Sequence, residues 1–129
     1  MWAVDYDERL SHLWLLYVVG FILHGVADPL ITHLIVNVFN VGVELNPLVR
    51  PSLQEGAVSF ALAYVPLYII AAAGLVALSA LYHRASDADQ IKIYRISRVI
   101  LHLVIVWGAL IVTWNLWVLF RELWFGRMV

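Results

Sequence analysis

The chain has 129 residues and a formal net charge of −1; 64% of its residues are hydrophobic and 13% are charged. Soluble domains are about a quarter charged, so the composition indicates an integral membrane protein of one domain. The basic residues are too few and scattered for a nucleic-acid-binding face. The chain has no cysteine, which excludes disulfides, thiolate metal sites and a cysteine nucleophile.

Three apolar runs, at about residues 13–37, 56–82 and 98–121, predict an all-α membrane protein with three transmembrane helices. At about 1.5 Å per residue, each run is long enough to cross a hydrocarbon core of about 30 Å. The segment before the first run is acidic, unlike the start of a signal peptide, so we expect this run to stay in the mature protein. The bias toward arginine over lysine and the acidic stretch 86–89 suit an archaea-like composition.

Pro29 predicts that the first helix is kinked or broken at Asp28-Pro29. Proline cannot donate to the carbonyl of Gly25, and it disfavours helical geometry at the residue before it. We therefore expect Asp28 to cap the second half of the helix. We also expect His24 or Thr32 to satisfy the freed carbonyl.

Local signals mark the other helix boundaries. Asn40 predicts the turn that ends the first helix, and Pro66 predicts a bend in the second. Ser52 and Glu55 have the spacing of a capping box, which predicts that the second long helix starts there. Ser86, followed by acidic residues, predicts the start of the third.

The loop charges predict a multi-pass protein of the cell membrane with a cytoplasmic N-terminus. Three spans place the N-terminal segment and the second loop on the same side. That side carries more basic residues (Arg9, Arg84, Lys92, Arg95, Arg98) than the other (Arg50, Arg121, Arg127). Cytoplasmic loops carry the excess of lysine and arginine.

Small residues on the second helix, around Ala73 and Ala77, predict close contact with another helix of this chain or of a copy. The third helix is rich in tryptophan, with Trp114, Trp117 and Trp124 near its end. These features favour a structural or accessory subunit in the lipid bilayer, packed as a homo-oligomer or with other membrane subunits. No nucleophile elbow, phosphate loop or zinc-protease motif is present, which favours a non-enzymatic role and leaves an enzyme as the alternative.

A polar cluster is the candidate functional site. His24, Asp28 and Thr32 share one helical face, and an intramembrane carboxylate costs about 2.5–3.5 kcal/mol unless it finds a partner. Glu44 and Asn46 follow in the next turn. If that turn folds inward, Asn46 joins Asp28 and Thr32 in one hydrogen-bonded cluster, with Glu44 at its rim. The alternatives are a helix cap at Asp28 and a solvated interfacial turn.

Oxygen ligands in this cluster suit a hard cation such as Ca²⁺, Mg²⁺ or Na⁺, so the candidate metal ligands are Asp28, Glu44 and His24. The same residues suit a proton-binding site of a transporter component or an enzyme. A histidine pair such as His24 with His102 has the ligand type for haem or a transition metal, but without an attachment motif we expect no haem and no other resident cofactor. We interpret Asn115 in the third span as a residue that hydrogen-bonds another helix, a contact that stabilises helix packing by about 1 kcal/mol.

Asp28-x-x-x-Thr32, followed by Gly42-x-Glu44-x-Asn46-Pro47-Leu48, resembles the signature of a family of small prokaryotic membrane proteins classed as a domain of unknown function. The resemblance extends over roughly residues 13–120. It implies three spans and groups Asp28, Thr32, Glu44, Asn46 and Asn115, but it implies no activity. Many members carry a lysine in the second span, where this chain has Tyr64 and Tyr68.

Overall fold

The computed structural model describes residues 6–41 and 47–126, and these residues form an all-α bundle with three helices long and apolar enough to cross a membrane. The first of them is joined from four pieces, as the proline predicted. Helix α1 (Tyr6–Ile22) passes through a π-helical turn, η1 (Leu23–Ala27), into α2 (Asp28–His33), and a second π-helical turn, η2 (Leu34–Val38), ends it. We call this continuous segment the first span.

The second span begins with α4 (Ala57–Ala63) and continues as α5 (Val65–Arg84). The two helices join at Tyr64, whose N–H donates to the Ala61 carbonyl, three residues back, just before Pro66. The predicted bend is therefore confirmed. The predicted start at the capping box is wrong, because a separate short helix, α3 (Arg50–Gln54), holds the serine of that motif, and Gly56 with φ 117° precedes α4.

The third span lies in α6 (Asp87–Phe125). The Ser86 side chain accepts from the Asp89 backbone N–H, so Ser86 is the N-cap that the sequence predicted. At the end of the first span, Asn40 has φ 53°, the left-handed geometry expected of a helix-terminating asparagine.

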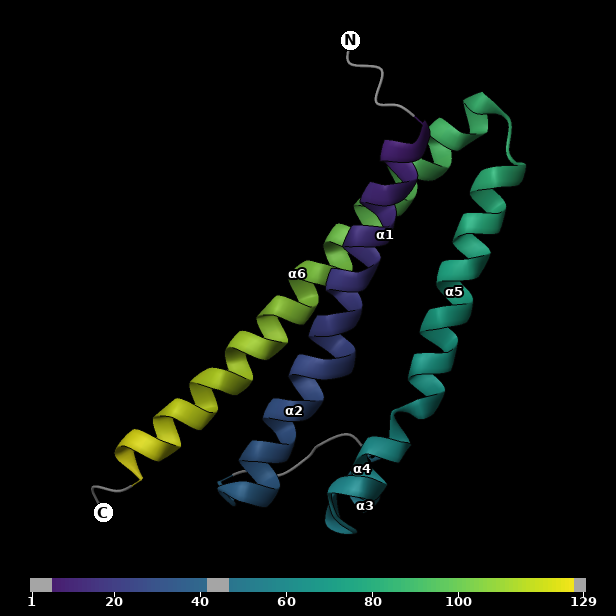
Figure 1. Cartoon of the computed structure of the whole chain (residues 1–129). Coiled ribbons are helices and arrows are strands. Elements are labelled where there is room, and N and C mark those ends of the chain that lie inside the picture. Colours follow the sequence, from purple (N-terminus) through teal and green to yellow (C-terminus); the bar gives the residue numbers. More distant parts are fainter. Residues whose placement is uncertain (1–5, 42–46, 127–129) are drawn as a thin grey trace.

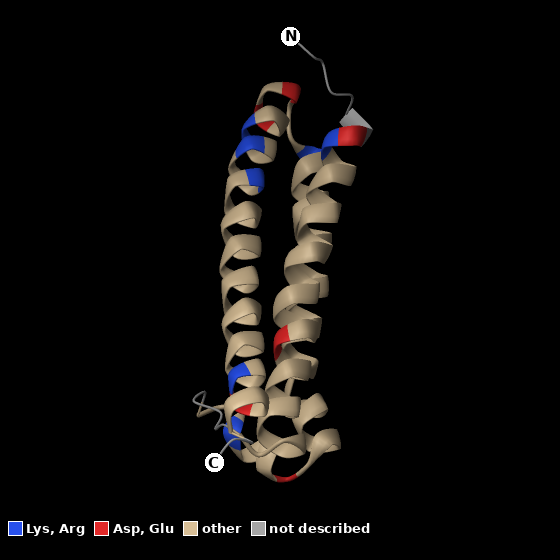
Figure 2. Cartoon of the chain, turned by 90° about the vertical axis from the view of Figure 1, so that its left-hand side faces the viewer, with Lys and Arg blue, Asp and Glu red and all other residues tan. Residues whose placement is uncertain are grey.

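The first span lies between the other two (Figure 1). It packs along α6 and has fewer contacts with α5. The start of α1 and the turn between α5 and α6 share one end of the bundle, with α3 and α4 at the opposite end (Figure 1). Charged residues gather at both ends, and an acidic segment on the first span lies between them (Figure 2).

Candidate functional site

The π-helical turn η1 sets the geometry of the polar site. Asp28 has φ −61° and ψ −50°, and its N–H donates to the Leu23 carbonyl, five residues back. The expectation that Asp28 is an N-cap is therefore wrong. A π-helical turn can absorb the disturbance caused by Pro29 by widening the helix, without leaving helical geometry. Turns of this type often occur at functional sites.

Tyr68 of α5 provides the donor that Pro29 lacks. Its hydroxyl donates to the Gly25 carbonyl at 2.7 Å. A Cβ atom added at Gly25 would lie 3.2 Å from the Tyr68 ring, so the glycine leaves room for this approach. We expected His24 or Thr32 to satisfy this carbonyl; the second span supplies the donor instead. The sequence signal for this contact was a tyrosine within the apolar second span.

Asp28 and Asn115 form a side-chain hydrogen bond between the first and third spans. The Asn115 side-chain N–H donates to a carboxylate oxygen of Asp28 at 2.7 Å, and both residues are half-buried. Asp28 is the only charged residue between Arg9 and Glu44. The amide offsets part of the cost of placing a carboxylate at membrane depth. Two members of the predicted cluster therefore meet across helices.

His24 lies one turn before Asp28 and contacts a different atom of α6. Its Nε2 lies 3.0 Å from the Val104 carbonyl oxygen, and because a carbonyl only accepts, Nε2 carries the proton. A Cβ atom added at Gly108 would lie 2.8 Å from this nitrogen. His24 thus acts as an interhelical donor. A metal or haem iron would have to use its other ring nitrogen.

The remaining predicted residues are placed as follows. Thr32 is half-buried on α2, one turn beyond Asp28. Glu44 and Asn46 lie outside the described residues, so their part in the cluster and in a cation site stays a prediction. In residues 6–41 and 47–126, no group of three or more His, Asp or Glu side chains is arranged to hold a metal ion.

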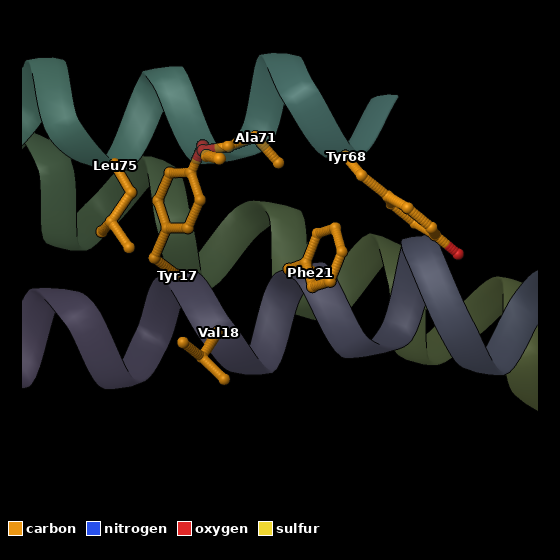
Figure 3. Close-up of a pocket in the computed structure, with 7 residues that line it drawn as sticks. Tyr17, Val18, Phe21, Tyr68, Ala71 and Leu75 are labelled. Atoms are coloured by element: carbon orange, nitrogen blue, oxygen red, sulfur yellow. The ribbon is translucent and has the colours of Figure 1, made fainter. Parts of the chain in front are cut away.

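Two further contacts join α1 to α5, and sequence reasoning missed both. The Tyr17 hydroxyl donates to the Ala71 carbonyl at 2.7 Å, and Figure 3 shows Tyr17 reaching across to Ala71. The indole N–H of Trp14 donates to the Ser79 hydroxyl at 2.9 Å. Gly74 faces Tyr17, because a Cβ atom there would lie 2.6 Å from its hydroxyl. No local signal in the sequence pairs these residues.

These long aromatic side chains hold α5 away from α1 and leave cavities between the spans. One cavity between all three spans has a volume of about 410 Å³, and Gly20, His24, Leu67 and Leu101 are among its lining residues. A smaller cavity of about 160 Å³ lies beside Tyr17 (Figure 3). Both are lined mainly by apolar side chains, so neither offers a set of polar groups for catalysis.

A family model described as a domain of unknown function (DUF5658) matches residues 19–121. The chain belongs to this family. The matched region holds both partners of the Asp28–Asn115 contact, the turn η1 and Tyr68. No curated protein and no solved structure matches the chain. Membership confirms the family resemblance seen in the sequence and brings no activity with it.

Proposed function

We propose that this protein is a structural or accessory membrane subunit that packs with copies of itself or with other membrane subunits through the second span. One observation supports the proposal. Within the described part of the chain, no residue in the most apolar stretch of Ala57–Arg84 is buried. Most of the second span therefore stays open to its surroundings, although Ala71 and Gly74 are half-buried against α1.

The small-residue face of α5 is the surface best suited to such packing. Ala73, Ala77 and Ala80 lie within one helical face, and all three are exposed. Gly74 and Ser79, two further small residues of α5, instead contact Tyr17 and Trp14 of α1. Association of helices in lipid depends on close backbone approach at small residues, so a helix of another chain is the partner for this face.

Cysteine cross-linking tests the proposal cleanly, because the natural chain has no cysteine. We expect Ala77→Cys to form an intermolecular disulfide or a cross-link to a neighbouring subunit in native membranes. Leu103→Cys is the matched control, since Leu103 is 65% exposed on α6, away from this face. Cross-linking at neither position, or equal cross-linking at both, would count against the proposal.

A second candidate function is cation or proton binding around Asp28, as a transporter component or an enzyme. It is supported by the hydrogen bond between Asp28 and Asn115 at membrane depth, because intramembrane acids often mark ion or proton pathways. Metal analysis of the purified protein separates the candidates. A stoichiometric metal that is lost in Asp28→Ala and kept in Asp87→Ala supports cation binding. A metal-free protein, or equal metal in both variants, rejects it.

A further inference from the structure

The first part of α6 extends beyond the apolar stretch that crosses the membrane. Residues 99–120 span roughly 33 Å at about 1.5 Å per residue, which matches a hydrocarbon core of about 30 Å. Arg98 therefore lies at the edge of the hydrocarbon, and Arg95 lies about one turn further out. This is the depth of lipid phosphate groups, since the headgroup layer adds roughly 5–8 Å on each side.

Arg95 and Arg98 face away from the bundle with His102. The three residues are spaced at i, i+3 and i+7, which places them on one helical face, and all three are exposed. Lys92 is already paired with Asp89 at 3.0 Å. Within residues 6–41 and 47–126, neither Arg95 nor Arg98 forms an ion pair. The two guanidinium groups are thus the uncompensated charges of this face.

A chain of contacts holds Arg98 in place. Its guanidinium carbon lies 5.6 Å from the centre of the Tyr94 ring. The Tyr94 hydroxyl in turn hydrogen-bonds His12 Nδ1 of α1 at 2.9 Å. On the deeper side, His102 Nδ1 donates to the Arg98 carbonyl at 2.6 Å, so His102 contacts the backbone of the residue that carries the guanidinium group. Because Tyr94 is fixed by a neighbouring helix, Arg98 needs little reordering to bind an anion.

We propose that Arg95 and Arg98 bind the phosphate of an anionic phospholipid in the leaflet at this end of the bundle, with His102 below them on the acyl-chain side. Guanidinium groups bind phosphate through paired N–H donors. The exposed apolar residues Val99 and Leu103 continue along α6 into the membrane and supply a surface for the acyl chains. The lipid would cover a face that the other two spans leave open.

Lipid titration of the purified protein in detergent tests this site. Short-chain phosphatidylglycerol, short-chain phosphatidylcholine and inorganic phosphate are the three probes, with bound lipid counted by native mass spectrometry. We expect saturable binding of phosphatidylglycerol only. One basic residue near a lipid surface is worth about fivefold in affinity, so the double variant R95Q/R98Q should bind roughly 25-fold more weakly.

Two controls make the result specific. Lys92→Gln removes the same charge at the same end of α6 and should leave binding unchanged, because Lys92 already pairs with Asp89. Tyr94→Leu keeps both arginines and should weaken binding by removing the support of Arg98. The proposal is overturned if phosphatidylcholine or phosphate binds equally well, or if Lys92→Gln weakens binding as much as the double variant. It is also overturned if the double variant changes the mass of a complex between protein chains but leaves the amount of bound lipid unchanged.

Discussion

The first span meets its two neighbours in different ways. Toward α6 the backbones approach closely, because Gly20 faces Val104 and Gly108 faces Leu23 and His24. Toward α5 the contact runs through the long side chains of Trp14, Tyr17 and Tyr68. Both interfaces use side-chain hydrogen bonds, but the first span makes more contacts with α6 than with α5. In lipid, close approach of backbones is a main source of helix association, so we expect the α6 interface to carry more of the stability.

The largest expected effect comes from filling the α6 interface at Gly108. Gly108→Leu adds a side chain where a Cβ atom alone would lie 3.0 Å from Leu23 Cβ and 2.8 Å from His24 Nε2. Overpacking of this kind costs roughly 1–3 kcal/mol, and we expect the upper part of that range. The free energy of unfolding in mixed micelles measures it. Ala109→Leu, at an exposed neighbouring position, is the control, and an equal loss there would contradict the packing argument.

The next effect comes from removing the amide that contacts Asp28. Asn115→Ala deletes the donor at 2.7 Å and should cost about 1–2 kcal/mol, because a half-buried carboxylate loses one of its partners. A double-mutant cycle with Asp28→Ala should show coupling above about 0.5 kcal/mol. Additive losses would mean that the contact contributes nothing. The same cycle with Asn46→Ala tests the prediction that Asn46 joins this cluster.

A smaller effect is expected at the α5 interface from Tyr68→Phe. The substitution keeps the ring and removes only the hydroxyl that donates to the Gly25 carbonyl. Interhelical hydrogen bonds in membranes average about 0.6 kcal/mol, and we expect about 1 kcal/mol here because proline leaves this carbonyl short of a donor. Amide hydrogen exchange around η1 should become faster. Tyr64→Phe is the control, and unchanged exchange in Tyr68→Phe would refute the role of the hydroxyl.

The smallest effect is expected from Trp14→Phe, which removes the bond to Ser79. Trp14 is 47% exposed, so the side chain can lose this partner at little cost. A destabilisation of about 0.5 kcal/mol or less should follow in the same unfolding assay. A loss as large as that of Gly108→Leu would reverse the proposed ranking of the two interfaces.

A comparison of predicted and observed helix boundaries shows which features can be read from the sequence. Asn40 and Ser86 were correctly predicted to end and start helices, because caps and turns depend on the backbone of a few adjacent residues. Pro29 correctly predicted a distorted first span but not its form. A missing donor can be accommodated by a break or by a wider turn, and local geometry alone does not choose between them. The capping box at Ser52 predicted the wrong start for the second span, because α4 begins later, directly after Gly56.

The sequence alone determined that this chain is a three-span membrane protein whose first span is disturbed at Pro29, because apolar run length and proline stereochemistry act locally. Only the tertiary structure decided that Asn115 contacts Asp28 and that Tyr68 supplies the donor for Gly25. Those pairings depend on how each helix is rotated and how far apart the helices lie. In lipid both faces of a span are apolar, so the hydrophobic pattern carries little information about which residues face each other.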